Sequence, residues 1–171
     1  PVVVRTPNRS WRSRRGSGGG SLYDYAAHPL DLLTWYLGEP TSVAGAQLTS
    51  IHSTETDDAV AATISYGDAT AVVNVNWSDE SQRKMSTKIT LWGTAGRITV
   101  DRYEVQVHLT GRMPVPDGYE VGMNVRYGTD LQETPAFYVR GEEYSAQLED
   151  FVRRVAAREL DGVSTFASAL A

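Results

Sequence analysis

The sequence predicts an α+β domain in which an open, predominantly antiparallel β-sheet has helices packed on one face. Between residues 41 and 109, apolar residues alternate with polar ones in short runs that are separated by turns, as in antiparallel strands. On either side of these runs, apolar residues recur at three- and four-residue steps, over residues 22–37 and 144–160, which is typical of helices. An order of helix, consecutive strands and helix is typical of α+β proteins.

The strands follow one another along the middle of the chain. After a short apolar run at residues 2–5, strands are predicted at residues 41–51, 60–66, 71–77, 85–91, 98–100 and 103–109. Gly67 and Asp68 predict a tight hairpin, and residues 93–96 predict a second turn. Residues 111–141 are rich in Gly, Pro and Tyr and show no regular pattern. We expect the strands to form one meandering sheet.

Length and composition are those of a globular domain. A chain of 171 residues with 41% hydrophobic and 22% charged residues corresponds to one domain and has no disordered character. The absence of cysteine excludes a disulfide framework and a thiolate zinc site, and it favours a cytoplasmic location. No apolar run approaches the roughly 18–20 residues of a membrane-spanning helix, so no membrane partner is expected.

The most informative stretch is the first predicted helix, in residues 18–40. Ser21 is the expected N-cap with Asp24 as its capping-box partner, and Gly38 and Pro40 predict the helix end. Pro29 predicts a kink or a division into two pieces, because it lacks an N–H group. The apolar stripe expected to face the sheet contains Leu22, Tyr25, Ala26, Pro29, Leu32, Leu33, Tyr36 and Leu37.

Asp24 and His28 lie four residues apart, a spacing that places two side chains on the same helix face. A carboxylate beside an imidazole stabilises its protonated form and orients its ring, so the pair suits general acid–base catalysis. Spacing alone also fits a purely structural pair. A metal site that includes Asp31 is a further alternative, but no second ligand cluster accompanies it, and no metal is expected.

The glycines at residues 18–20 do not complete a dinucleotide-binding fingerprint. Counted from Gly16, the third glycine position holds Ser21, and an arginine-rich segment rather than a clear strand precedes it. We interpret these glycines as a turn where the backbone passes close to a neighbour before a helix starts. No cofactor is therefore expected to bind this chain itself.

The run Gly-Gly-Gly-x-Leu-x-Asp-x-x-x-His-x-x-Asp-x-x-x-Trp-x-x-Gly-x-Pro, which begins at Gly18, resembles the second domain of the glucose–fructose oxidoreductase / inositol dehydrogenase (Gfo/Idh/MocA) family. Three weaker similarities follow in the same order as in the family. They are Trp92-Gly-Thr-Ala-Gly-Arg-Ile98, a helix at residues 143–152 that ends in Phe-Val, and a tail from Asp161 that resembles the approach to the last long helix. The resemblance covers nearly the whole chain.

The resemblance implies a site and a cofactor. In the family, the histidine matched by His28 relays the proton of a substrate hydroxyl, and the aspartate matched by Asp24 helps to hold substrate and histidine. A lysine completes the group from a Rossmann domain that binds NAD or NADP. No part of this sequence matches that domain, so we expect it to be absent here and the final helix to be truncated. We expect substrate-binding residues at Asn8, Trp11, Arg12 and Asp31.

The first fifteen residues carry five arginines and a charge of +5, while the remaining residues carry −10. A nucleic-acid site is not expected, because Trp11 is the one aromatic residue among these arginines and the rest of the chain is acidic. We instead expect the arginines to pair with the acidic body or to line a substrate cleft or domain boundary.

These observations lead to a single-domain interpretation of residues 1–171. We expect the substrate-binding and oligomerisation domain of an NAD(P)-dependent oxidoreductase that acts on a sugar, inositol or related polyol hydroxyl. The uncovered sheet face is polar but short of charge, and in the family this face commonly pairs with another subunit, so we expect a homo-oligomer. The alternative is a non-catalytic module that assembles through its sheet. The expected face contains Asn74, Asn76, Lys88, Thr90, Gln106 and His108.

Overall fold

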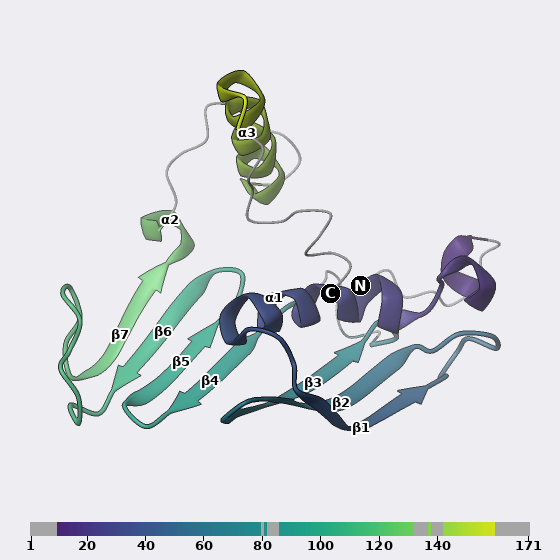
Figure 1. Ribbon diagram of the computed structural model, residues 1–171, viewed down its shortest axis with the longest axis horizontal. Coiled ribbons are helices and arrows are strands. Elements are labelled where there is room, and N and C mark those ends of the chain that lie inside the picture. Colours follow the sequence, from purple (N-terminus) through teal and green to yellow (C-terminus); the bar gives the residue numbers. More distant parts are fainter. Residues whose placement is uncertain (1–9, 80, 82–85, 132–136, 138–141, 160–171) are drawn as a thin grey trace. The chain divides into compact units, whose positions relative to one another are not determined.

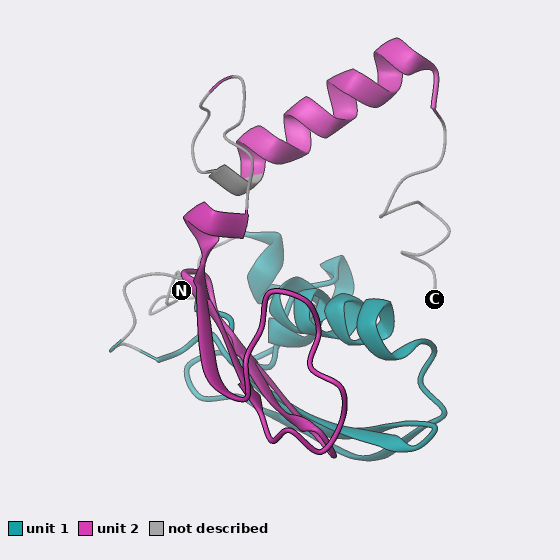
Figure 2. Ribbon diagram, turned by 90° about the vertical axis from the view of Figure 1, so that its left-hand side faces the viewer, with its two compact units in different colours: residues 1–87 teal, residues 88–171 magenta. Residues whose placement is uncertain are grey.

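The computed structural model describes residues 10–79, 81, 86–131, 137 and 142–159 (Figure 1). The predictions for the strand at residues 2–5, for Asn8 and for the tail from Asp161 lie outside these ranges. The chain divides into two compact units, residues 1–87 and residues 88–171 (Figure 2).

The predicted α+β class is confirmed, and every strand pair is antiparallel. The strands form two hydrogen-bonded sheets rather than one meander: a three-stranded sheet in the order β1-β2-β3 and a four-stranded sheet in the order β4-β5-β6-β7. The ladder is interrupted between Asn76, where β3 ends, and Ile89, where β4 begins. Beyond β3, the Trp77 N–H donates to the Asp58 carbonyl oxygen, which extends the β2–β3 pairing by one residue, and the Ser78 N–H donates to Asn76 Oδ1.

The first unit packs one helix on its three-stranded sheet. The sheet consists of β1 (Ser42–Thr49), β2 (Ala59–Tyr66) and β3 (Ala69–Asn76), with the predicted hairpin at Gly67 between β2 and β3. Two short 3-10 turns, η1 (Trp11–Ser13) and η2 (Arg15–Ser17), precede a π-helical segment, η3 (Leu22–Ala26), that continues directly into α1 (Ala27–Leu37). The predicted division at Pro29 is therefore wrong: the helix continues through this residue, and its geometry changes from π-helical to α-helical at Ala27.

The core of this unit lies between α1 and the sheet. Its buried centre consists of Ile64, Tyr66, Ala71 and Val73, and the helix residues packed against it are Leu30, Leu33 and Leu37. The predicted stripe is thus right for Leu33 and Leu37, and Ala26 is fully buried. It is wrong for Tyr36, which is 53% exposed, because the packed side of α1 is defined by Leu30, Leu33 and Leu37 and Tyr36 points away from it.

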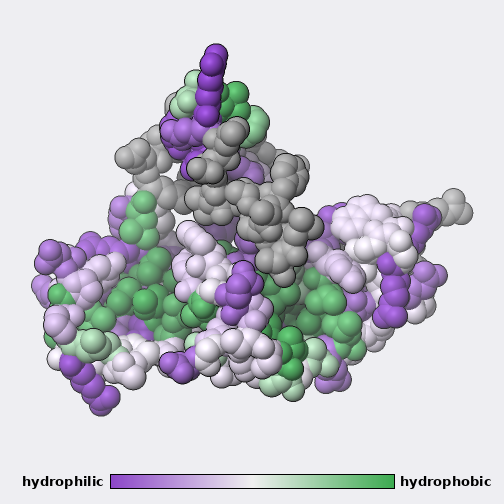
Figure 3. All heavy atoms as spheres, in the orientation of Figure 1, coloured by the Kyte–Doolittle hydropathy of each residue, from purple (hydrophilic) through white to green (hydrophobic). Residues whose placement is uncertain are grey.

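The second unit contains the four-stranded sheet of β4 (Ile89–Gly93), β5 (Gly96–Val100), β6 (Glu104–Leu109) and β7 (Gly122–Tyr127). Apolar side chains gather over its strands (Figure 3), and Val107 is its buried residue. Strand β7 lies in the segment for which the sequence indicated no regular structure. The Asn124 side chain binds Glu120, Gly122 and Val107, and thereby holds the preceding loop against the sheet.

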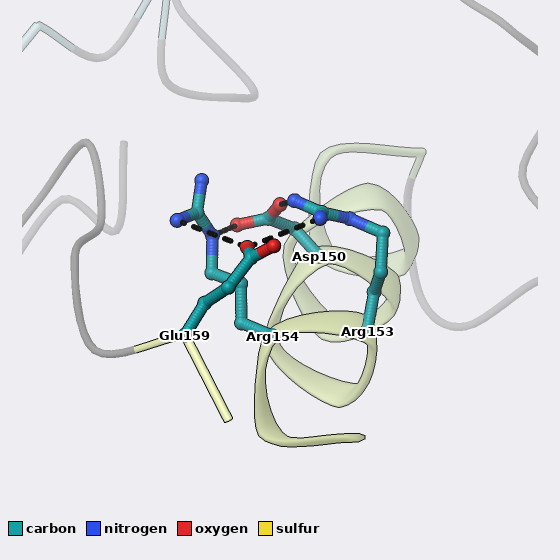
Figure 4. A network of polar contacts seen from close by, with 4 residues as sticks. All are labelled: Asp150, Arg153, Arg154 and Glu159. Atoms are coloured by element: carbon teal, nitrogen blue, oxygen red, sulfur yellow. Dashed lines mark hydrogen bonds and ion pairs between the residues drawn. The ribbon is translucent and has the colours of Figure 1, made fainter. Parts of the chain in front are cut away.

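Two helices follow β7, namely α2 (Gly128–Leu131) and α3 (Glu142–Ala157). The apolar residues that recur at helical steps from residue 144 onward lie on α3, and they are not buried. Its side chains are between 43% and 63% exposed at Tyr144, Leu148, Phe151, Val152 and Val155. The polar side of α3 carries a network in which Arg153 and Arg154 each bind Asp150 at 2.7 Å and Arg153 also binds Glu159 (Figure 4). Such exposed pairs contribute little stability.

Candidate functional site

The helix that carries the predicted site begins at a buried carboxylate from a distant part of the chain. Ser21 donates through its Oγ to Asp57 Oδ2 at 2.7 Å, and the Leu22 N–H donates to the same oxygen at 2.7 Å. The Ser21 N–H donates to the Asp57 carbonyl oxygen at 2.9 Å. Ser21 has helical backbone angles and makes no side-chain cap, so the predicted Ser21–Asp24 capping box is wrong. Asp57 takes its place because its carboxylate reaches the free N–H groups directly.

Two glycines let the chain reach this point. A Cβ on Gly20 would overlap Asp57 Oδ1, and a Cβ on Gly19 would overlap the carbonyl oxygens of Trp11 and Arg12. Gly20 also has a φ of +116°, which disfavours other residues. This agrees with the interpretation of the glycine run as a turn of close backbone approach. The Leu22 N–H, a type of donor that binds phosphate at other helix starts, donates to Asp57 here.

Arg12 and Asp24 form an ion pair on the solvent side of the helix. Arg12 Nε donates to Asp24 Oδ2 at 2.6 Å, and its Nη2 lies 3.5 Å from Oδ1. The Asp24 side chain is 15% exposed and that of Arg12 is 46% exposed. The hydrogen bond to Asp24 raises the pKa of Arg12 above its ordinary value, so the guanidinium stays charged. Its carbon lies 5.0 Å from the centre of the Trp11 ring, within cation–π distance.

His28 is exposed one turn beyond Asp24 on the same helix. Among the described residues, the Asp24 carboxylate binds Arg12, and no hydrogen bond or ion pair joins it to His28. Asp24 lies inside the π-helical segment, whose wider turn differs from the α-helix on which the four-residue spacing argument depends. Asp31 is exposed on α1. The structure therefore brings Trp11, Arg12 and Asp24 together and leaves the imidazole open to solvent.

A second buried carboxylate supports the helix from beneath. Asp58 Oδ1 accepts a hydrogen bond from the Trp77 indole N–H at 2.6 Å, and the Trp77 ring meets that of Tyr25 edge to face, with centres 5.7 Å apart. Asp58 Oδ2 accepts the backbone N–H groups of Ile51, His52 and Ser53. Burial acts to raise the pKa of Asp58, but the hydrogen bonds outweigh it and hold that pKa well below its ordinary value.

The adjacent acids Asp57 and Asp58 were not identified from the sequence as part of the site. They end the acidic, polar segment at residues 53–58, which has the composition of a turn, where exposed carboxylates are usual. Two consecutive carboxylates directly before an apolar strand are the available signal, and it is a weak one. No group of three or more side chains that could hold a metal occurs among the residues the structure describes. None of the described helices is long and apolar enough to cross a membrane.

Three solved structures with a similar fold are distant in sequence. An oxidoreductase domain protein from Kribbella flavida has a TM-score of 0.68 and 18% identity, and the match covers 98% of this chain and 49% of that protein. An oxidoreductase from Agrobacterium radiobacter in complex with NAD+, L-tartaric acid and magnesium has a TM-score of 0.60 and 18% identity, and the match covers 86% of this chain and 42% of that protein. A NAD-binding protein from Listeria innocua has a TM-score of 0.55 and 19% identity, and the match covers 94% of this chain and 44% of that protein.

The chain spans less than half the length of each of these proteins. No curated protein matches it. A family model, however, matches residues 3–99, which are more than half of the chain and include the site helix and the whole of the first sheet. The resemblance noted in the sequence is thereby confirmed, and this chain belongs to the GFO/IDH/MocA C-terminal domain family.

Proposed function

We propose that this chain is the substrate-binding and oligomerisation domain of an NAD(P)-dependent oxidoreductase that acts on the hydroxyl of a sugar, inositol or related polyol. Membership of an oxidoreductase C-terminal domain family is the observation that carries this proposal. The NAD-binding neighbours of the same fold support it, since each is about twice as long as the part that matches. Polyols also suit a site that presents charged and aromatic side chains together.

The described residues suit the binding of a hydroxyl compound and not of a dinucleotide. The Leu22 N–H at the helix start is bound by Asp57, and we propose that residues outside this chain hold the nicotinamide nucleotide. Oxidation of an alcohol removes a hydride from carbon and a proton from oxygen, and a nicotinamide accepts hydride alone. The role of this chain in the reaction is therefore to orient the substrate hydroxyl and to accept its proton.

His28 is the base that we assign to this step. Its imidazole is exposed to solvent, and histidine exchanges a proton near neutral pH. The Arg12–Asp24 pair, one helical turn before it, offers a guanidinium as donor and a carboxylate as acceptor for other hydroxyl groups of a polyol. Trp11 adds an apolar face next to Arg12. Asp31 follows on the same helix and is assigned to substrate binding as well.

The test is His28→Ala in a protein that contains this chain together with a dinucleotide-binding domain. Reduction of NAD+ or NADP+ is followed spectroscopically with a panel of sugars, inositols and related polyols. We expect kcat to fall about 10²- to 10⁴-fold with a small change in KM, because a positioned base acts mainly on the chemical step. His52→Ala, which removes an exposed histidine outside the site, should keep wild-type kinetics. Equal activity of the His28 variant and wild type would reject the assignment.

The uncovered face of the first sheet favours a role in assembly, which applies equally to a non-catalytic module. The strand pairing places the following residues on the face opposite the core: Ser42, Gly45, Gln47, Thr49, Ala59, Ala61, Thr63, Ser65, Thr70, Val72, Asn74 and Asn76. None of these residues is charged, and Val72 is 79% exposed. A face permanently in water normally carries charged side chains, so we propose that another copy of the chain covers this one.

A further inference from the structure

The start of the site helix depends on one side chain that does not belong to the proposed substrate site. We propose that Asp57 is a positioning residue: its buried carboxylate fixes where the helix begins and, through Gly20, where the Arg12–Asp24 pair lies. The inference rests on the proposed function in taking that pair and His28 as the substrate site. Asp57 is 7% exposed and reaches only the protein's own backbone and hydroxyl groups, so it acts through other residues.

The first link is the helix end itself. The first N–H groups of a helix have no partner within it, and the partial positive charge there favours an anion. Asp57 Oδ2 accepts both Ser21 Oγ–H and Leu22 N–H at 2.7 Å, and its own carbonyl accepts the Ser21 N–H. Because Ser21 is fully buried and has a helical backbone, no other described cap fixes this end. The carboxylate therefore determines the position of the first turn.

The second link is the arginine-bearing segment. The Gly20 N–H donates to the Arg12 carbonyl oxygen at 3.1 Å, and the Gly19 N–H donates to that of Arg14 at 3.0 Å. The absence of a Cβ on either glycine allows the two backbones, and the carboxylate of Asp57, to approach this closely. The segment around Arg12 is thus held against Gly19 and Gly20, which are in turn held against Asp57.

The two links close into a ring of contacts. Asp57 binds the first turn, which carries Asp24; Asp24 binds the Arg12 side chain; and the Arg12 backbone binds Gly20 beside Asp57. Loss of the carboxylate frees the first turn and the Arg12 segment together. The consequence differs from a loss of stability alone, because it changes the relative placement of Arg12, Asp24 and His28 in molecules that remain folded.

The structural arm of the test measures amide hydrogen exchange by NMR in Asp57→Ala and Asp57→Asn. We expect the Leu22 amide to exchange about tenfold faster in Asp57→Ala, while the core amide of Val73 changes much less. Asparagine retains one acceptor oxygen, so Asp57→Asn should give a smaller increase. Asp68→Asn, which changes an exposed aspartate in the β2–β3 turn, is the matched control and should leave both amides unchanged. Equal acceleration at Leu22 and Val73 would indicate a merely structural role and overturn the proposal.

The kinetic arm uses a protein that contains this chain and a dinucleotide-binding domain. A displaced site should raise KM at least threefold and lower kcat about 10- to 100-fold, whereas fewer folded molecules would lower the apparent kcat and leave KM unchanged. If Asp57→Ala does not fold, both the hydrogen-exchange and the kinetic measurements are made on Asp57→Asn. Unchanged Leu22 exchange in the folded variants overturns the positioning role whatever the activity. An inactive wild type with accelerated Leu22 exchange in the variants would instead reject the proposed function and retain the positioning role.

Discussion

Asp58 is the clearest case in this molecule of a charge stabilised inside a protein by hydrogen bonds. Its side chain is fully buried, and an isolated buried carboxylate would be protonated rather than charged. Three consecutive backbone N–H groups, the Ser53 hydroxyl and the Trp77 indole all donate to it, at 2.6 to 2.8 Å. The carboxylate therefore joins the loop before β2 to the residue after β3.

Replacement of Asp58 should destabilise the first unit. Asp58→Ala leaves the buried indole N–H and the loop donors without their acceptor, which should lower the free energy of unfolding by about 3 kcal/mol. Because folding lowers the pKa of Asp58, its contribution is fully present above the unfolded value, about 3.9, and is lost as pH falls toward the folded value. Urea unfolding at about pH 7 and about pH 3 measures both effects.

The expected pattern is a large stability difference between wild type and Asp58→Ala at neutral pH that narrows in acid. Asp68→Asn should follow the wild type throughout, because Asp68 is exposed in a turn. A difference of the same size at both pH values would contradict the role of the ionised carboxylate.

The contacts of Ser21 and Asp24 show the limit of sequence rules that consider only neighbouring residues. Ser21 and Asp24 have the spacing of a capping box, and the sequence therefore predicted a helix start stabilised by its neighbours. The structure instead uses Asp57, separated from Ser21 by 36 positions, and pairs Asp24 with Arg12. Neither partner is recoverable from spacing, because both contacts depend on how the chain returns to the helix. The motif located the helix and its polar side chains but could not assign their partners.

At the scale of elements, the site helix combines two geometries. A proline removes the hydrogen bond to the residue four positions earlier, which for Pro29 is Tyr25, and Tyr25 lies within the π-helical segment Leu22–Ala26. The sequence predicted a kink or a division at Pro29, whereas the helix is continuous there and its change of geometry precedes the proline. Single π-helical turns are frequent at functional sites. Here the segment carries Asp24.

The site helix can pack against Asp57 because two glycines, Gly19 and Gly20, directly precede it. Gly20→Ala should lower the free energy of unfolding by at least about 2 kcal/mol, because the new Cβ overlaps Asp57 Oδ1 and the φ of +116° is strained for alanine. Gly16→Ala is the control, since nothing lies within 4 Å of a Cβ at that position. Thermal unfolding of both variants makes the comparison. Equal melting temperatures would show that the chain can relax around Gly20 without cost.

The strands illustrate when alternation predicts structure. Strands β2 and β3 have buried alternate residues on one face, so periodicity and burial agree, and their predicted bounds nearly match. Strand β7 was not predicted, although Met123, Val125 and Tyr127 alternate with polar residues, because glycine and proline surround the segment. In the structure all three side chains are exposed, so this alternation does not mark a buried face. The place of β7 is set by pairing with β6 and by Asn124, which are contacts between distant residues. Alternation is thus most informative where a strand buries one face.

At the scale of the whole molecule, the uncovered sheet faces are the feature that a single copy does not explain. In the second sheet, Thr90, Thr99 and Gln106 form one row across three strands, and Trp92, the charged Arg97 and His108 form another row on the same face. Trp92 belongs to this face and is 78% exposed. The predicted polar surface therefore exists as two faces on separate sheets, with Asn74 and Asn76 on the other. An antiparallel sheet can leave one face in water, but an uncharged or aromatic face is better covered.

The last prediction is that the chain forms a homodimer through the uncharged face of the β1–β3 sheet. The paired substitution Val72→Glu and Asn74→Glu places two like charges midway along β3 on this face, where burial against a second copy would desolvate them. Light scattering should give twice the chain mass for the wild type and the monomer mass for this variant. Asp68→Lys is the matched control, because it reverses a charge in the β2–β3 turn beyond the end of the face. A wild-type monomer at high concentration, or a variant that remains dimeric, would contradict assembly through this surface and leave the absence of charge there without an explanation.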